Sequence, residues 1–215
     1  MSENVIRDLK AKTLNIKSKK EEKWLYEATT GLLDRLMAFI FLIISLPILI
    51  FFAVLIKFED GGPIFYCQDR VGKGGYPFVV YKMRSMCVDH AGNGASETEM
   101  NDPRITKIGR VMRLTRIDEI PQLLNILLGS MKLIGPRPLV PEQIIKYSNE
   151  LPDFVNRLVV KPGVTGWAQV NGGNEVVPKE KLCLDIEYIE NRGFLMYMNI
   201  VLKTIWVVLS GDGAR

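Results

Sequence analysis

An uncharged apolar segment constrains the fold of this chain more than any other feature. It covers residues 36–56, which are 21 positions without a charged side chain. As a helix rising ~1.5 Å per residue, the segment would be long enough for the ~30 Å hydrocarbon core of a bilayer. Thirty-five mostly polar residues precede it, which is not the pattern of a cleavable signal peptide. The segment therefore predicts a membrane element.

Ser45 and Pro47 interrupt this segment near its middle. Proline removes a backbone donor and its ring clashes with the carbonyl of Ile43, so a bend is expected there. One alternative is a kinked helix that still spans the bilayer. The other is a re-entrant helix-break-helix over residues 34–58, which enters and leaves through the same leaflet.

The flanking charges favour re-entry. A spanning helix usually leaves its Lys and Arg excess on one side of the membrane. Here both flanks are basic, and their charges are Lys17, Lys19, Lys20, Lys23 and Arg35 before the segment and Lys57, Arg70, Lys73, Lys82 and Arg84 after it.

The rest of the chain divides around this segment. Residues 1–33 are rich in Lys and Glu and predict a polar arm or a surface helix near head groups. Residues 59–193 are long enough for one folded domain. Residues 194–215 begin with an apolar stretch that contains Lys203, which predicts either a helix lying along the membrane surface or a C-terminal core helix.

The predicted fold class is α+β and helix-rich. Two short strands, 64–69 and 77–82, are rich in aromatic and β-branched residues and predict a small β-hairpin. Residues 86–103 are polar and predict a loop. Helices are expected from Arg104, from Asp118 and over 139–150 and 179–191, with apolar faces formed by Ile105, Ile108, Val111, Met112, Ile120, Leu123, Leu124 and Leu127.

Composition limits the partners. The net charge of +4 indicates an anionic partner, such as nucleic acid, lipid head groups or a phosphorylated substrate. The sequence contains no recognised nucleic-acid-binding motif, so that partner class is disfavoured. Three scattered cysteines without a CxxC pair argue against a disulfide framework and a zinc site and fit a reducing compartment.

The chemistry is expected in stretches dense in Gly, Pro and Arg, namely 113–125, 135–138 and 161–173. Such loops position the backbone donors and guanidinium groups that a diphosphate needs. Asp118 and Glu119 could simply be first-turn acids of a helix. Alternatively, one carboxylate attacks phosphorus while its neighbour holds a hard cation, which together with Arg113, Arg116 and Arg137 screens the charge.

These residues resemble the bacterial sugar transferase family, the small monotopic phosphoglycosyl transferases. The similarity includes the broken apolar segment and four motifs in order. The motifs are YKMRSM (81–86), DPRITKIGRVMRLTRIDEIPQLLNILLGSMKLIGPRPL (102–139), KPGVTGWAQVNG (161–172) and LDIEYIEN (184–191).

The resemblance implies a Mg²⁺-dependent ping-pong enzyme at the cytoplasmic face of the bacterial inner membrane. A phosphosugar would pass from a UDP-sugar to polyprenyl (undecaprenyl) phosphate, with release of UMP. Asp118 would be the nucleophile that becomes an aspartyl-phosphosugar, and Glu119 the Mg²⁺ ligand. Further residues expected to bind substrate or phosphate are Arg113, Arg137, Lys82, Arg84, Lys161 and Asp185.

The sequence departs from the family pattern in three places, and the first of them motivates an alternative. Gly173 stands where members commonly have arginine, Lys161 stands where arginine is frequent, and residues 129–132 read GSMK where members often have GDMS. A membrane-bound scaffold that lost turnover is therefore the rival interpretation. Membrane lipids are expected partners in either case, and a second copy of the chain is left open as another.

Overall fold

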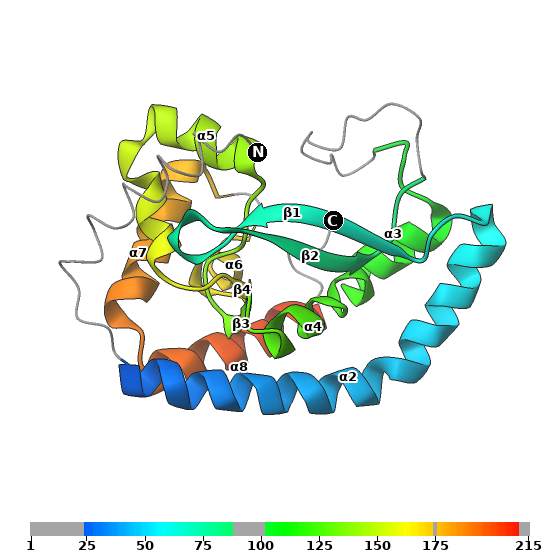
Figure 1. The fold of residues 1–215 in the computed structure, drawn as a ribbon, viewed down its shortest axis with the longest axis horizontal. Helices are drawn as coiled ribbons and strands as arrows, with labels where there is room; N and C mark the ends of the chain where they lie inside the picture. Colours follow the sequence, from blue (N-terminus) through cyan, green and yellow to red (C-terminus); the bar gives the residue numbers. More distant parts are fainter. Residues whose placement is uncertain (1–23, 88–101, 174–175, 211–215) are drawn as a thin grey trace.

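The computed structural model describes residues 24–87, 102–173 and 176–210. Figure 1 shows a bent N-terminal helix that runs beneath and around a small mixed domain. The elements in order are α2 (Trp24–Asp60), β1 (Phe65–Val71), η1 (Lys73–Gly75), β2 (Pro77–Met83), α3 (Lys107–Leu114), η2 (Ile117–Glu119), α4 (Gln122–Leu127), β3 (Lys132–Ile134), α5 (Pro141–Glu150), η3 (Pro152–Val159), β4 (Gly163–Thr165), α6 (Trp167–Val170), α7 (Pro178–Asn191) and α8 (Phe194–Ser210).

The apolar segment lies within α2, which is one continuous helix with Pro47 inside it. The helix begins at Trp24, so residues 24–33 of the predicted arm are helical. The predicted break into two helices is not observed, because a proline removes a single N–H while the turns on either side keep their bonds. Ser45 Oγ donates to the Leu42 carbonyl at 3.1 Å, and Figure 1 shows α2 turning upward in its second half.

Both ends of α2 are attached to the domain. Near the beginning, Asp34 accepts hydrogen bonds from Tyr197 Oη at 2.7 Å and from the Leu133 N–H at 3.2 Å. At the end, Asp60 forms an ion pair with Arg84. One face of the helix therefore follows the domain along its length.

The opposite face of α2 is apolar and exposed. Tyr26–Asp60 is long and apolar enough to cross a membrane, yet only 6% of its most apolar window is buried. The buried side chains are those that face the domain, such as Ala38 against α4 and Ile56 against Met83 and Met112. Exposed apolar side chains on α2 are Leu32, Leu33, Leu36, Phe39, Ile40, Phe41, Ile43, Ile44, Leu46, Ile48, Ile50, Phe51, Val54 and Phe58.

The predicted β-hairpin is confirmed. β1 and β2 pair antiparallel, from Phe65 opposite Met83 to Val71 opposite Pro77. Asn125 of α4, which is 1% exposed, fastens the helix to β2. Its Nδ2 donates to the Val79 carbonyl at 2.6 Å and its Oδ1 accepts from the Tyr81 N–H at 3.1 Å. η2, which directly precedes α4, is thereby held beside β2.

A second pair of strands was not predicted. β3 and β4 are parallel, with Lys132 opposite Gly163 and Ile134 opposite Thr165. Glycine is required where they continue, because a Cβ on Gly163 would lie 2.1 Å from the Gly135 nitrogen. This close backbone contact brings the Gly135–Pro138 loop beside the 161–166 stretch.

Several helices are confirmed to within a few residues, namely α5, α7 and α8, whereas η3 and α6 were not predicted. The expected apolar faces are partly wrong, because Val111 is 49% and Leu124 is 38% exposed while Asn125 is buried. In α8, Tyr197 and Ile200 are buried and Leu195, Leu202 and Trp206 are exposed. Most of the loop predicted over 86–103 lies outside the described residues.

Candidate active site

Two carboxylates occupy one tight turn between α3 and α4. After α3 ends, Arg116 adopts a left-handed backbone conformation with φ of 57°, and the chain enters η2. Asp118, at the middle of η2, is 8% exposed. The second helix was predicted to begin at Asp118, but α4 begins four residues later, immediately after Pro121.

Glu119 is held by two cations from different elements. Its Oε1 accepts from Lys82 Nζ of β2 at 2.8 Å and from Arg137 Nη2 of the Gly135–Pro138 loop at 2.8 Å. Burial acts to raise the pKa of Glu119, but Arg137 and Lys82 outweigh it and hold this pKa well below the usual range. Glu119 is therefore an ionised carboxylate that is held between two cations.

Asp118 has a different environment from its neighbour. Burial raises the pKa of Asp118 to about 6, the charge of Glu119 adds to the rise, and Lys82, Arg113 and Arg137 oppose it. Adjacent carboxylates with pKa values pushed in opposite directions are typical of sites where two acids perform two tasks. Asp118 is the acid suited to attack, since Glu119 is already committed to two cations.

Arg113 lies in the last turn of α3. Its Nε donates to Ser85 Oγ at 2.9 Å, which orients the guanidinium group. Burial lowers the pKa of Arg113, and the charges of Asp118 and Asp102 act against that shift. The structure thus brings five of the predicted site residues together, namely Lys82, Arg113, Asp118, Glu119 and Arg137.

Two other predicted residues lie elsewhere. Arg84 forms an ion pair with Asp60, and its Nε donates to the Pro63 carbonyl at 2.6 Å. Its observed contacts fasten the end of α2. Lys161 lies near Gly129, beyond the opposite end of α4 from Asp118. A role for Arg84 or Lys161 in substrate binding stays a prediction.

Asp185 is buried in α7 and acts through Arg157. Asp185 Oδ2 and Arg157 Nη2 are 2.7 Å apart, and both side chains are 2% exposed. Burial raises the pKa of Asp185, and the charge of Arg157 opposes the rise. Arg157 Nη2 also donates to the Arg137 carbonyl at 3.0 Å. This pair supports the backbone that carries the Arg137 side chain.

Sequence reasoning missed Arg157, Asn125 and Ser85. Ser85 was visible only as part of the 81–86 motif, and Arg157 lies just before the 161–173 stretch without a pattern of its own. Each of these residues acts through a partner far away in the sequence. For Asn125 and Arg157 the signal would have been a polar residue in a largely apolar window, whereas Ser85 follows Arg84 in a charged stretch and has no such signal.

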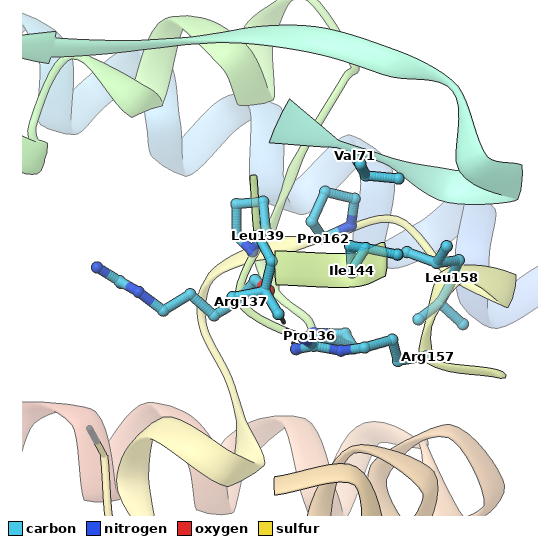
Figure 2. Close-up of a pocket in the computed structure, with 10 residues that line it drawn as sticks. Val71, Pro136, Arg137, Leu139, Ile144, Arg157, Leu158 and Pro162 are labelled. Atoms are coloured by element: carbon cyan, nitrogen blue, oxygen red, sulfur yellow. Dashed lines mark hydrogen bonds between the residues drawn. The ribbon is translucent and has the colours of Figure 1, made fainter. Parts of the chain in front are cut away.

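A small pocket underlies the Gly135–Pro138 loop (Figure 2). In Figure 2 the Arg137 side chain extends away from the pocket, while Arg157 lies close to Pro136. The loop thus points its guanidinium group outward, toward Glu119, and turns its prolines inward. The lining residues are Val71, Pro136, Arg137, Pro138, Leu139, Ile144, Arg157, Leu158, Val160 and Pro162.

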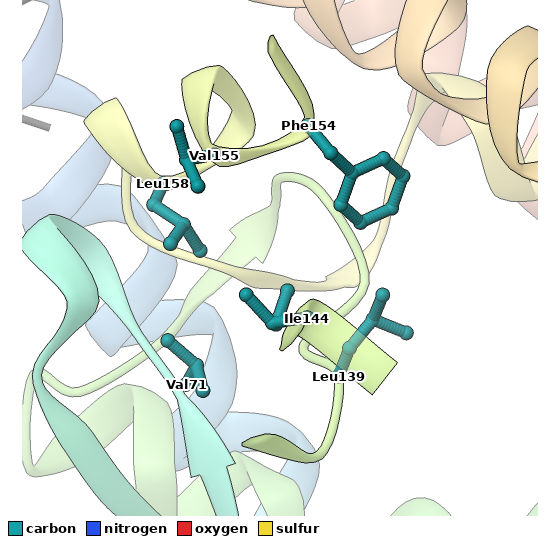
Figure 3. Close-up of a cluster of buried hydrophobic side chains, with 6 residues drawn as sticks. All are labelled: Val71, Leu139, Ile144, Phe154, Val155 and Leu158. Carbon is teal, nitrogen blue, oxygen red and sulfur yellow. The ribbon is translucent and has the colours of Figure 1, made fainter. Parts of the chain in front are cut away.

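An apolar cluster fixes the far side of this loop (Figure 3). It joins the end of β1, the residue after Pro138, α5 and η3. Arg70 adds a polar contact, since its Nη1 donates to the Pro138 carbonyl at 3.2 Å. The loop is therefore held by apolar packing and by a hydrogen bond from Arg70. The cluster consists of Val71, Leu139, Ile144, Phe154, Val155 and Leu158.

The donor set is compatible with Mg²⁺ only when a phosphorylated substrate contributes. The described residues contain no group of three or more His, Cys, Asp or Glu side chains arranged for a metal. Mg²⁺ commonly binds one or two carboxylates and completes its octahedron with water and phosphate oxygens. Asp118 and Glu119 fit that requirement, although Glu119 Oε1 already faces Lys82 and Arg137.

Comparisons with known proteins found a matching family model and several relatives. The family model described as "Bacterial sugar transferase" matches residues 25–211. The chain is 41% identical over 186 residues to a UDP-N-acetylgalactosamine-undecaprenyl-phosphate N-acetylgalactosaminephosphotransferase of Aeromonas hydrophila, which covers 85% of this chain and 44% of that protein.

Two further relatives carry glucose in their names. A UDP-glucose:undecaprenyl-phosphate glucose-1-phosphate transferase of Caulobacter vibrioides is 37% identical over 187 residues, covering 85% of this chain and 70% of that protein. An undecaprenyl-phosphate glucose phosphotransferase of Komagataeibacter xylinus is 41% identical over 182 residues, covering 79% of this chain and 34% of that protein. The chain thus spans less than half of two of these three relatives, and their names differ in the sugar.

Proposed function

This chain belongs to the bacterial sugar transferase family, and from that premise we propose that it transfers a phosphosugar from a UDP-sugar to undecaprenyl phosphate. The resemblance found in the sequence is confirmed at the level of the family. The relatives named above support the two substrate classes. The observation that carries the proposal is the buried Asp118 beside a Glu119 that is already neutralised by Lys82 and Arg137.

Two displacements take place at one phosphorus atom, with Asp118 as the nucleophile in the first and the leaving group in the second. In the first, a carboxylate oxygen of Asp118 bonds to the phosphorus that carries the sugar, and the bond to the bridging oxygen breaks, releasing UMP. In the second, an oxygen of undecaprenyl phosphate attacks the same phosphorus and Asp118 leaves as a carboxylate. The aspartyl-phosphosugar thus divides one difficult transfer into two steps.

The surrounding cations lower the cost of bringing a diphosphate to two carboxylates. Arg137 presents a fork of donors suited to phosphate oxygens, and the buried Asp185–Arg157 pair and Arg70 fix its backbone. Arg113 approaches Asp118 from α3. Mg²⁺, when bound, would supply further charge screening at the diphosphate, and Glu119 would hold it.

We also propose that α2 enters and leaves the cytoplasmic face of the inner membrane. A spanning helix would place its ends on opposite sides of a ~30 Å core. The attachments of Asp34 and Asp60 to the same domain favour re-entry instead. The exposed apolar face of α2, with α8 beside it in Figure 1, would then lie in lipid, and α8 would be interfacial.

The decisive experiment is mass spectrometry of the purified full chain. The protein is incubated with a panel of UDP-sugars and Mg²⁺, without acceptor, and then with undecaprenyl phosphate. We expect release of UMP and a phosphosugar adduct on Asp118 that the acceptor removes, with Asp118→Asn as the control that forms no adduct. An active preparation with no adduct, or with one on another residue, would contradict the covalent step.

The same panel tests the alternative of a membrane-bound scaffold. Gly173, which replaces the arginine frequent in relatives, has a left-handed backbone with φ of 60°. Absence of UMP release with every sugar would favour the scaffold. UMP release with a single sugar would identify the donor.

A further inference from the structure

Two cations converge outside the candidate active site. A Cβ placed on Gly129 would lie 3.0 Å from Arg35 Nη2 and 3.9 Å from Lys161 Nζ, so both cationic groups lie over this glycine. Gly129 follows α4 and has a φ of 81°. α4 separates it from η2, which contains Asp118. The Arg35–Lys161 site is therefore distinct from the pair of carboxylates.

No carboxylate of the described residues forms an ion pair with Arg35 or Lys161. The neighbouring Lys132 already has partners in Glu27 at 2.6 Å and Thr30 at 2.9 Å. Burial lowers the pKa of Lys161, and the charges of Arg35, Lys132 and Lys73 lower it further. An anion placed between Arg35 and Lys161 would relieve this repulsion.

The surroundings of the Arg35–Lys161 site are apolar on one side. Arg35 is exposed at the beginning of the uncharged segment, and the next residue, Leu36, is 55% exposed. Leu128, adjacent to Gly129, is 72% exposed. A ligand at this site would therefore contact two cations with its anionic end and exposed apolar side chains with its remainder.

We propose that Arg35 and Lys161 bind the phosphate of an anionic phospholipid head group. A phosphodiester offers oxygens that accept from both a guanidinium group and an ammonium group, and its acyl chains would follow the exposed face of α2. This inference rests on the membrane association proposed above and not on the transfer reaction. It assigns lipid selectivity to a site at the opposite end of α4 from Asp118.

The test measures binding of the purified full chain to vesicles by flotation. Vesicles contain phosphatidylcholine alone or mixed with phosphatidylglycerol, at low and at high salt. We expect the wild-type chain to prefer the mixed vesicles at low salt, and the Arg35→Gln/Lys161→Gln variant to lose about tenfold or more of that preference. Retention of the full preference by the double variant would overturn the proposal.

A matched control removes the same charge from elsewhere. Lys146→Gln/Lys179→Gln changes α5 and α7, and α5 lies on the far side of the domain from α2 in Figure 1. This control is expected to keep the preference, and an equal loss would show only general electrostatic attraction, against the proposal. The charge-preserving pair Arg35→Lys/Lys161→Arg should also keep it. Thermal melting of each variant establishes that it is folded.

A second arm separates lipid from free anion. Inorganic phosphate is added without vesicles, and the melting temperature is followed. Stabilisation of the wild type but not of the double variant, together with an unchanged vesicle preference, would identify a free-phosphate site and overturn the lipid assignment. UMP release is not the measurement in either arm, so failure here would be distinguishable from failure of the proposed transferase function.

Discussion

Around Glu119 each cation faces a carboxylate, whereas Arg35 and Lys161 face each other at the opposite end of α4. Lys82 and Arg137 both contact Glu119 at 2.8 Å. Near Gly129, by contrast, two cations share a space with no described carboxylate paired to either. In the first region both cations already contact a carboxylate before any ligand arrives. The second has a surplus of positive charge that an anion would neutralise.

The largest expected effect follows from removing the nucleophile. Asp118→Asn preserves the size of the side chain, but an amide cannot form an acyl-phosphate. We expect turnover to fall by more than about 10³-fold. UMP release measured with donor, Mg²⁺ and acceptor checks this. Nearly normal turnover would mean that the region around Glu119 does not contain the reacting group.

The next effect concerns the cation that balances Glu119. In Arg137→Gln, Lys82 is the one remaining cation of the pair that contacts Glu119. We expect kcat/KM to fall about 100-fold. Arg137→Lys keeps the charge without the fork of donors, so its loss should be smaller. Steady-state kinetics of both variants decides the matter. Equal losses would show that geometry alone is required and that charge balance is not.

The pH dependence should follow Asp118. Its pKa is raised to about 6, and the attacking form is the carboxylate, so kcat/KM should fall about tenfold per pH unit below 6. The pH profile of the free enzyme measures this. A profile that is flat down to pH 4 would mean that Asp118 is not the group that must lose a proton.

The raised pKa of Asp118 also affects stability, and in the opposite direction: raising the pH should increase activity but lower the free energy of unfolding. Because the folded-state pKa lies above the unfolded value of 3.8, the folded state holds the proton more tightly, and ionising Asp118 costs stability above pH 6. A shift of about two units corresponds to about 3 kcal/mol. Asp118→Asn should therefore be more stable than the wild type at pH 8, with the advantage vanishing below pH 4. Urea unfolding at both pH values tests it.

The smallest expected effect concerns Arg157, which holds the backbone of Arg137 without belonging to the pair of carboxylates. Arg157→Lys retains a charge for Asp185 but loses the fork that also reaches the Arg137 carbonyl. We expect kcat/KM to fall about fivefold through misplacement of Arg137, without displacement of the acidic limb of the pH profile. A shifted limb would instead connect Arg157 to the titration of Asp118.

The sequence was sufficient to predict elements that depend on local periodicity and turn residues. The hairpin, α5, α7 and α8 follow from period and turn residues, and Asp118 and Glu119 follow from their place in a motif. The predicted face of α4 was partly wrong, because Leu123 is buried and Leu127 packs against the same cluster while Leu124 is 38% exposed. A helix of six residues completes fewer than two turns, which leaves its period ambiguous. Asn125 is buried there because β2 presents backbone groups that need partners.

Contacts between distant residues could not be predicted. Asp185 and Arg157 are 28 positions apart, and nothing in the local pattern pairs them. Arg84 is a related case, since its motif suggested a substrate contact, which stays a prediction, and gave no sign of its observed partner, Asp60. The parallel β3–β4 pair likewise depends on a close approach of Gly135 and Gly163, which only the folded backbone reveals.

The attachment of α2 at Asp34 and at Asp60 has a consequence for how deep the protein would sit. A domain joined to its membrane anchor by a flexible linker samples many heights above the membrane. A domain attached at both ends of the anchor is held at one height. If the outer face of α2 lies among acyl chains, the height of Asp118 above them is set by the fold. A lipid substrate whose phosphate stays at constant depth would then meet the carboxylate without any change in protein shape.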